Sequence, residues 1–592
     1  MGILRFSDFS GLIPKLAPRQ LPDQNAQYAI NAKLGSGELR GWGGPKLIAT
    51  ASTFARRVYH FVRDGVDHYV PFARRTEMVR ALLINDAFDR IYYTDATGAY
   101  VTTEQRIVDG LPPFACGVPT PVVTGLQVTV TGGSENTSEV RVYSCTLVSN
   151  YGEESAPCVA AIGSGNVDGT WRVKGMSSLI FNDAAYPNVT KFRLYRTLTS
   201  ASGVDYRMVR EWKLDPTKKG LDPVTQRRWG LPNSYVDTVK SSVVAANFPM
   251  KSAGWMPPPA GLRGVVSCSG GFLAGFVGNT IRFSVPYQPH AWPDDYQLAV
   301  EDDIVGLGVF DSAVVAVTKG RPAVAIGYSP DSMALTNFPD PYPCLSVDGI
   351  VSTSVAVMFP SEQGLISIDP SGVNIVTEPL MTREEWAKYS PSTIRAAAKD
   401  TFYVGFYSDT MGFALDFTDP ARAMTNLMLP GVTGLDIDRL TGRLLVLRNR
   451  EILEWDGDLA NPMETVWRSK PILLPKPYNF GAIQVRGGFG PTLNPRGAVD
   501  PDGYTVNTND AGGDFPLGGD GESRLNSADV GYVRVRLIAD NEVVFDGQIN
   551  DELVHRLPSG FKATQYEVEI ATSAQVMSVT LAGTPHELEQ AT

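Results

Sequence analysis

The chain has 592 residues, of which 43% are hydrophobic and 19% are charged, so it is long enough for several cores and has a globular composition. A typical domain length of roughly 100–200 residues suggests about three or four domains. The formal net charge of −11 argues against a protein that grips DNA by its phosphates, because such binding depends on clustered Lys and Arg. The 57 Gly and 42 Pro residues, scattered without a period, indicate many short elements joined by turns.

Residues 1–54 contain Pro14, Pro18 and Pro22, which favour an extended chain and cannot donate hydrogen bonds to a sheet. We therefore predict an extended N-terminal segment that forms no sheet of its own, with a candidate helix at 23–31. The N-terminus lacks the apolar run and the cleavage site of a signal peptide. No run of about 18 apolar residues occurs anywhere, so no membrane anchor is expected.

Residues 55–110 contain short β-runs separated by tight polar turns, and units of the same form recur through 257–486. About 40–50 residues per unit, with turns every 8–12 residues, is the spacing typical of propeller blades. We predict that 55–110 supplies the first propeller strands and that 257–486 supplies the remaining blades. One ring would then be closed by strands from both parts of the chain.

Residues 111–256 differ in character and lie between two proline-rich junctions, Leu111-Pro112-Pro113 and Pro257-Pro258-Pro259. Their chain of β-runs predicts an inserted fibronectin III or immunoglobulin-like sandwich, in which Val142 and Tyr143 point to opposite faces and 151–155 forms a hairpin turn. Such modules are commonly spacers or partner surfaces. A carbohydrate-binding surface is the alternative.

Residues 487–530 are rich in Gly and Asp and are too long for an ordinary connection. Residues 531–592 predict a small antiparallel β module, with Asp540-Asn541 as a two-residue hairpin turn. Helical signals are otherwise scarce: Thr382 can cap a turn at 382–389, and a second turn is expected at 391–398. The predicted fold class is all-β, a β-propeller with an inserted sandwich and a small C-terminal β module.

Five cysteines are widely spaced, without Cys-x-x-Cys or a zinc-binding spacing. We expect them to be reduced core residues. Cys145 and Cys158 are the pair that can face each other across a sheet, and a chain made in a cytosol keeps such residues as thiols.

The sequence contains no His-Glu-x-x-His, no Gly-x-Ser-x-Gly and no phosphate-binding loop. Glycosidases need two carboxyl groups that face one bond about 5–10 Å apart, which sequence adjacency does not provide. The adjacent acid pairs are Asp294-Asp295, Asp302-Asp303 and Glu384-Glu385. Asp500-Pro501-Asp502-Gly503 lacks the later ligands of a calcium loop. We predict no enzyme activity, no cofactor and no metal site, and interpret these carboxylates as solvated turn residues.

Three blocks of the chain share a pattern with a known family. The first runs from Asp8-Phe9-Ser10-Gly11-Leu12 through Leu16-Ala17-Pro18 and Leu21-Pro22-Asp23 to Ser36-Gly37-Glu38-Leu39-Arg40 and Pro45. The second is Phe283-Ser284-Val285-Pro286-Tyr287 with Pro289-His290-Ala291-Trp292-Pro293. The third runs from Arg536-Leu537-Ile538-Ala539-Asp540 to Arg556-Leu557-Pro558-Ser559-Gly560-Phe561, then Thr584-Pro585. Together they resemble tail nozzle proteins of short-tailed bacteriophages, the tail tubular B type, and they leave the sandwich untouched.

The resemblance implies a structural virion protein, located in the phage tail and synthesised and assembled in the host cytoplasm. It implies an N-terminal assembly segment and a propeller-based subunit of a hexameric ring, below a tail adaptor protein ring and carrying tail fibre or spike proteins. Phage DNA would pass through the ring during ejection without specific binding. The alternative is a receptor-binding or glycan-binding tail protein, which could also degrade the glycan and would need a groove of aromatic residues and paired acids.

For such a ring, the 487–530 loop is a candidate channel gate. An acidic lining suits a conduit for a polyanion, because each phosphate that a basic residue neutralises adds binding energy. The residues expected to face the lumen are Asp500, Asp502, Asp510, Asp514, Asp520 and Glu522. A loop on the outer surface is the alternative.

Overall fold

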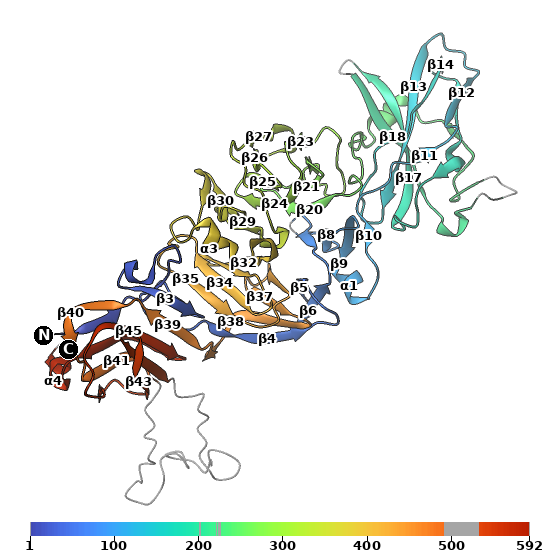
Figure 1. Ribbon diagram of the computed structural model, residues 1–592. Helices are drawn as coiled ribbons and strands as arrows, with labels where there is room; N and C mark the ends of the chain where they lie inside the picture. Colours follow the sequence, from blue (N-terminus) through green and yellow to red (C-terminus); the bar gives the residue numbers. More distant parts are fainter. Residues whose placement is uncertain are drawn as a thin grey trace, which may run out of the picture. The chain divides into compact units, whose positions relative to one another are not determined.

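The computed structural model describes residues 2–83, 85–200, 203–220, 222, 227–489 and 532–590 (Figure 1). The fold is all-β, with propeller-type four-stranded sheets, an inserted sandwich and a C-terminal β module, as the sequence predicts. Two compact units divide the chain: Arg74–Pro343, here called the central unit, and Met1–Ala73 with Cys344–Thr592, here called the terminal unit. No helix among the described residues has the length and apolar character that crossing a membrane requires.

Three four-stranded antiparallel sheets of the central unit have the layout of propeller blades, in which consecutive strands are neighbours. They are β7 (Glu77–Arg80), β8 (Arg90–Thr94), β9 (Ala99–Thr103) and β10 (Phe114–Ala115); β20 (Arg263–Ser267), β21 (Leu273–Val277), β22 (Thr280–Phe283) and β23 (Gln297–Ala299); and β24 (Ile304–Phe310), β25 (Ala313–Thr318), β26 (Ala323–Ile326) and β27 (Ala334–Asn337). The first strand of the middle sheet, β20, contacts both β7 and β24. Every residue of β25 is buried, which explains its continuous apolar run. β10 falls inside the predicted insertion but completes the first sheet, so the sandwich begins after it.

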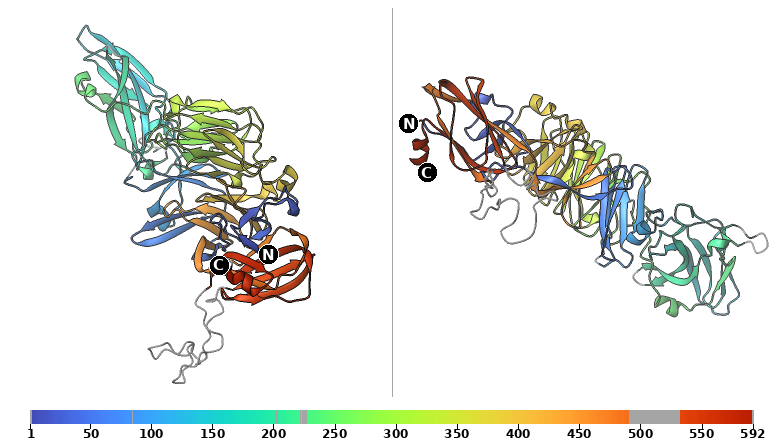
Figure 2. Two further views of the ribbon diagram at one scale, coloured as in Figure 1. Left: turned by 90° about the vertical axis from the view of Figure 1, so that its left-hand side faces the viewer. Right: turned by 90° about the horizontal axis from the view of Figure 1, so that it is seen from below.

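Two further sheets of the central unit form the inserted sandwich (Figure 2). One consists of β12 (Gln127–Thr131), β15 (Thr170–Lys174) and β19 (Ser234–Asp237). The other consists of β14 (Ala161–Asn166), β13 (Ser138–Ser149), β17 (Val189–Ser200) and β18 (Gly203–Lys213). The short strands β11 (Val122–Val123) and β16 (Leu179–Ile180) form a separate two-stranded sheet. Tyr143 is fully buried in the sandwich core with Trp171 and Phe192, whereas Val142 is partly exposed, as the alternation predicts. The predicted hairpin turn is confirmed by the bridge between Val148 and Glu154.

The propeller-type sheets of the terminal unit use strands from both sides of the insertion. They are β28 (Val351–Ser352), β29 (Val357–Pro360), β30 (Leu365–Asp369) and β31 (Gly372–Ile375); β32 (Arg395–Lys399), β33 (Phe402–Phe406), β34 (Met411–Asp416) and β35 (Met424–Met428); β36 (Gly434–Ile437), β37 (Leu444–Arg448) and β38 (Glu451–Pro462) with β4 (Gly43–Thr50); and the hairpin β5 (Arg57–Arg63) and β6 (Val66–Phe72). β4 pairs with β38, and Lys46 lies opposite Glu454. β4 lies within 1–54, outside the range 55–110 to which we assign the first propeller strands, so a single ring closed by strands from both parts of the chain stays a prediction.

The N-terminal segment is more regular than its prolines suggest. It contains β1 (Leu4–Ser7), β2 (Ser10–Leu12) and β3 (Asn25–Ile30) as well as β4, and β2 pairs with β3 in parallel. The prediction that this segment forms no sheet of its own is wrong, because Pro14, Pro18 and Pro22 lie in the connection between β2 and β3 and interrupt neither strand. The predicted helix at 23–31 is also wrong: β3 bonds to β39 (Thr465–Ser469) on one side and to β35 on the other.

The C-terminal module is larger than the predicted range 531–592. One sheet has the order β1, β46 (Gln575–Ala582), β41 (Ala482–Gly488) and β44 (Val554–Arg556); the other continues from β3 and β39 into β45 (Ala563–Thr572), β42 (Val533–Ala539) and β43 (Glu542–Ile549), with β40 (Ile472–Tyr478) on β45. Figure 2 shows the blue N-terminal strands beside the red module. Phe9 and Trp467 meet edge to face in its core, with ring centroids 4.9 Å apart. The predicted turn is confirmed, because Asp540 and Asn541 both have positive φ between β42 and β43.

Helices among the described residues are short. They are α1 (Glu104–Val108), α2 (Ser241–Ala245), α3 (Arg383–Ala387) and α4 (Pro585–Gln590), with 3-10 turns η1 (Pro18–Gln20), η2 (Met176–Ser178), η3 (Pro216–Lys218), η4 (Pro330–Ser332), η5 (Val347–Gly349) and η6 (Pro391–Thr393). Thr382 caps α3, because its hydroxyl accepts the Glu385 N–H, as the sequence predicts. The helical turn expected at 391–398 is shorter than predicted: it consists of η6 alone, and strand β32 begins at Arg395.

All five cysteines are free thiols. Cys145 and Cys158 are neighbours in the sandwich core, where the Cys145 N–H donates to Cys158 Sγ at 3.2 Å. The hydrogen bond from the Cys145 side chain is the main reason why the pKa of Cys158 is lowered to about 7, while burial raises the pKa of Cys145 well above its usual value.

Candidate functional sites

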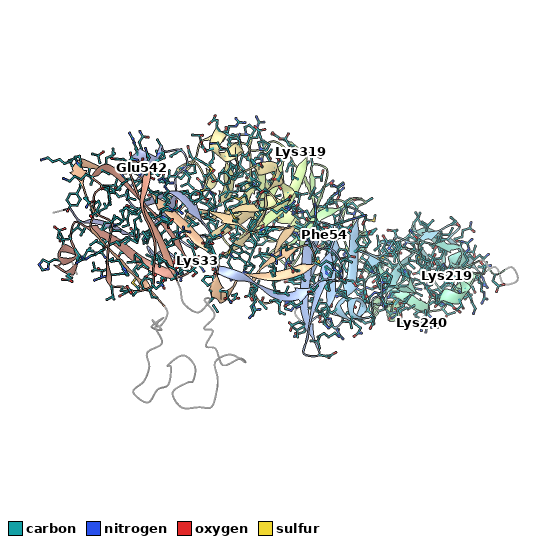
Figure 3. All side chains as sticks on the ribbon, turned by 60° about the horizontal axis from the view of Figure 1, so that its bottom comes forward. Lys33, Phe54, Lys219, Lys240, Lys319 and Glu542 are labelled. Atoms are coloured by element: carbon teal, nitrogen blue, oxygen red, sulfur yellow. The ribbon has the colours of Figure 1, made fainter. Side chains whose placement is uncertain are left out.

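The adjacent acid pairs form local contacts at turns rather than a shared cleft. Asp303 pairs with the exposed Lys319, labelled in Figure 3, at 3.0 Å. Asp302 accepts the backbone N–H of Arg321 at 2.8 Å. Asp294 is exposed and lies 3.6 Å from Arg282. Glu384 and Glu385 occupy the first turn of α3. These contacts are those of turn residues, the interpretation made from the sequence.

The candidate gate residues Asp500, Asp502, Asp510, Asp514, Asp520 and Glu522 lie outside the described residues. Their placement in a channel therefore stays a prediction. Gly487 and Gly488, which the prediction assigns to the loop, are the last residues of β41.

The terminal unit contains a pocket lined by three arginines, here called the arginine pocket. Its lining is Arg56, Arg57, Asp348, Arg395, Thr433, Gly434 and Leu435, and its volume is about 210 Å³ including space open to solvent. The residues come from the starts of strands β5, β32 and β36 and from η5. Glycine is needed at 434, because a Cβ there would lie 2.5 Å from the Arg56 carbonyl oxygen. Arg395 lies far from Arg56 and Arg57 in the sequence; the three converge because β5 and β32 both pack against β36.

Hydrogen bonds between β5 and β36 hold one wall of the arginine pocket. The Arg57 guanidinium donates to the Leu435 carbonyl at 2.8 Å, and the Thr433 hydroxyl donates to the Ala55 carbonyl at 3.1 Å. Arg395 donates to the Val432 carbonyl at 3.1 Å. Sequence analysis missed this site, and the doublet Arg56-Arg57 is its only local signal.

A buried polar cluster connects β5 to the turn that follows β36. His60 is hydrogen-bonded through Nδ1 to Asp438 at 2.9 Å and through Nε2 to Asp67 at 2.8 Å. Asp438 also accepts the Thr441 hydroxyl and the Leu440 N–H. Burial alone raises the pKa of Asp438, but the hydrogen bonds from Thr441, Leu440 and His60 outweigh burial and hold its pKa below the usual range.

We expect Asp438→Asn to lower the free energy of unfolding by about 1–3 kcal/mol near neutral pH, because it removes a buried acceptor of several hydrogen bonds. A carboxylate with a depressed pKa stabilises the fold above its unfolded-state pKa of about 3.9, and this contribution is lost as the pH falls through the lower folded-state value. Urea unfolding of both proteins should therefore show a difference that shrinks below about pH 4.

Asp67→Asn is the matched control, because Asp67 contacts the same histidine but its side chain is 61% exposed. Its effect should be smaller, as for other exposed pairs. A difference between Asp438→Asn and wild type that stays constant as the pH falls would contradict the assignment.

Among the described residues, no group of three or more His, Cys, Asp or Glu side chains is arranged to hold a metal ion.

No protein-family model matches the chain, and no curated protein is similar to it in sequence. Solved structures share its architecture only distantly. BamB from Moraxella catarrhalis is 11% identical, with a TM-score of 0.24, over 55% of this chain and 93% of that protein. The AfRom2 CNH domain is 6% identical, with a TM-score of 0.27, over 70% and 98%. Glutaminyl cyclase from Myxococcus xanthus is 11% identical, with a TM-score of 0.20, over 33% and 89%. None of these likenesses bears on function.

Proposed function

We propose that this chain is a structural virion protein that forms the ring-shaped tail nozzle of a short-tailed bacteriophage. In this role it is a conduit for DNA ejection and a platform for tail fibres or spikes. The acidic net charge of −11 suits a conduit, because a ring of such chains repels the phosphates that pass through it.

The support for this proposal is the position of the resemblance blocks in the fold. Phe9 and Leu39 of the first block belong to the same buried core as Leu537 and Leu557 of the third block. The Leu39 N–H also donates to the Val576 carbonyl at 2.9 Å. Blocks from opposite ends of the chain therefore belong to one folded module, so the resemblance at the two ends concerns the same part of the protein.

Negative-stain imaging of the purified chain, and of its parent particle labelled with an antibody to this chain, tests the proposal. We expect closed hexameric rings in the first sample and label on the tail in the second. A chain that stays monomeric at every concentration, together with particles that carry no label on the tail, would overturn it.

A structural role also predicts that the chain releases no sugars from host surface polysaccharide. The assay is incubation of the purified protein with the polysaccharide, followed by measurement of reducing ends. The expected value is that of a heat-inactivated control. Sugar release that Asp302→Asn or Asp303→Asn abolishes would contradict this prediction and would move the protein into the enzyme class.

A further inference from the structure

The arginine pocket carries positive charge that neighbouring carboxylates do not balance. Arg57 lies near two acids, 3.6 Å from Asp436 and 3.9 Å from Asp348. Among the described residues, Arg56 and Arg395 make no ion pair, although both line the same pocket. Three guanidinium groups therefore meet two carboxylates, and the excess charge is concentrated on the side of Arg56 and Arg395.

The pocket is held in shape by contacts that leave this charge in place. Arg57 donates to the Leu435 carbonyl and Arg395 donates to the Val432 carbonyl, and a carbonyl restrains a guanidinium without neutralising it. Each guanidinium has five N–H donors in a planar fork, so donors remain after one backbone contact. Restraint before binding lowers the entropy lost when an anion is bound.

The size of the pocket limits what it can hold. The enclosed part of the pocket is only about the size of a water molecule and the rest of its volume is open to solvent, so it cannot enclose a whole organic ligand. A single carboxylate or phosphate group can bind at the open side, and both match the guanidinium fork in a bidentate manner.

We propose that the arginine pocket binds a small oxyanion, a carboxylate or a phosphate group, with Arg395 and Arg56 as its main ligands and Arg57 as a third donor. The proposal does not depend on the ring or on the tail. It identifies a binding site that the family resemblance does not include.

Isothermal titration of the full chain with inorganic phosphate, and separately with acetate, tests the proposal at low salt. We expect a saturable single site that weakens as salt is raised, since screening reduces the attraction. Arg395→Gln should lower the affinity about tenfold or more, the usual scale for losing charge-assisted hydrogen bonds. Saturation by acetate points to a carboxylate, such as that of a protein partner, whereas saturation by phosphate alone points to a phosphate group.

Arg56→Gln is a second test that spares the fold, because Arg56 is exposed and its side chain makes no hydrogen bond among the described residues. Arg443→Gln is the matched control: it removes a half-exposed arginine of the same unit that pairs with Glu454 and does not line the pocket. The control should bind like the wild type. Absence of saturable binding of either anion, or binding that both Arg395→Gln and Arg56→Gln leave unchanged, would overturn the proposal.

Discussion

A chain that lacks residues 1–54 should fail to fold its terminal unit. The deletion removes β4 from the edge of β38 and β3 from between β35 and β39. It also removes three buried aromatic side chains, Phe6, Phe9 and Trp42, of which Trp42 meets Phe402 edge to face at 5.1 Å. Truncation of a buried Phe or Trp commonly costs about 3–5 kcal/mol. Three such losses, together with the four missing strands β1 to β4, are comparable to the roughly 5–15 kcal/mol that stabilises a whole domain.

Solubility and urea unfolding of the 55–592 fragment provide the measurement. We expect aggregation, or loss of the cooperative transition that belongs to the terminal unit. The full chain with Leu47→Ala is the control, because Leu47 lies in β4 but is 55% exposed, so its replacement should change stability by about 1 kcal/mol at most. Cooperative unfolding of the fragment with full stability would show that the N-terminal segment is dispensable.

Asp237→Asn should destabilise the sandwich by about 3–5 kcal/mol, because it leaves a buried arginine without a counter-charge. The side chains of Arg196 and Asp237 are both fully buried and form an ion pair. Asp237 also accepts the Tyr143 hydroxyl at 2.7 Å and lies 3.8 Å from Arg141. Thermal and urea unfolding of the full chain should show an earlier transition for the central unit.

Two comparisons separate the buried charge from general damage. Asp303→Asn removes an exposed pair with Lys319 in the same unit and should cost about 0–1 kcal/mol. Adding Arg196→Met to Asp237→Asn removes the unpaired charge and should recover part of the loss. A loss from Asp237→Asn no larger than that from Asp303→Asn would contradict the role assigned to the buried pair.

Features that depend on neighbours in sequence could be predicted without the structure. The alternation at Val142 and Tyr143, the cap at Thr382 and the turn at Asp540-Asn541 all follow from local geometry, and the structure confirms each of them. The all-β class and the propeller-type sheets also follow, because short β-runs between tight turns bond mainly to the next run along the chain.

The sequence by itself determined the all-β class, most short β-runs of the propeller-type sheets and the turns between them, since each depends on backbone preferences within a few residues. Only the tertiary structure decided that residues 25–30 form a strand, that β4 pairs with β38, and that the C-terminal module is completed by the N-terminus. Only it brought Arg57 and Arg395 into one pocket. The physical reason is the same in each case: a strand is stabilised by hydrogen bonds and packing from partners hundreds of residues away, so its own sequence carries little information about which partner it meets.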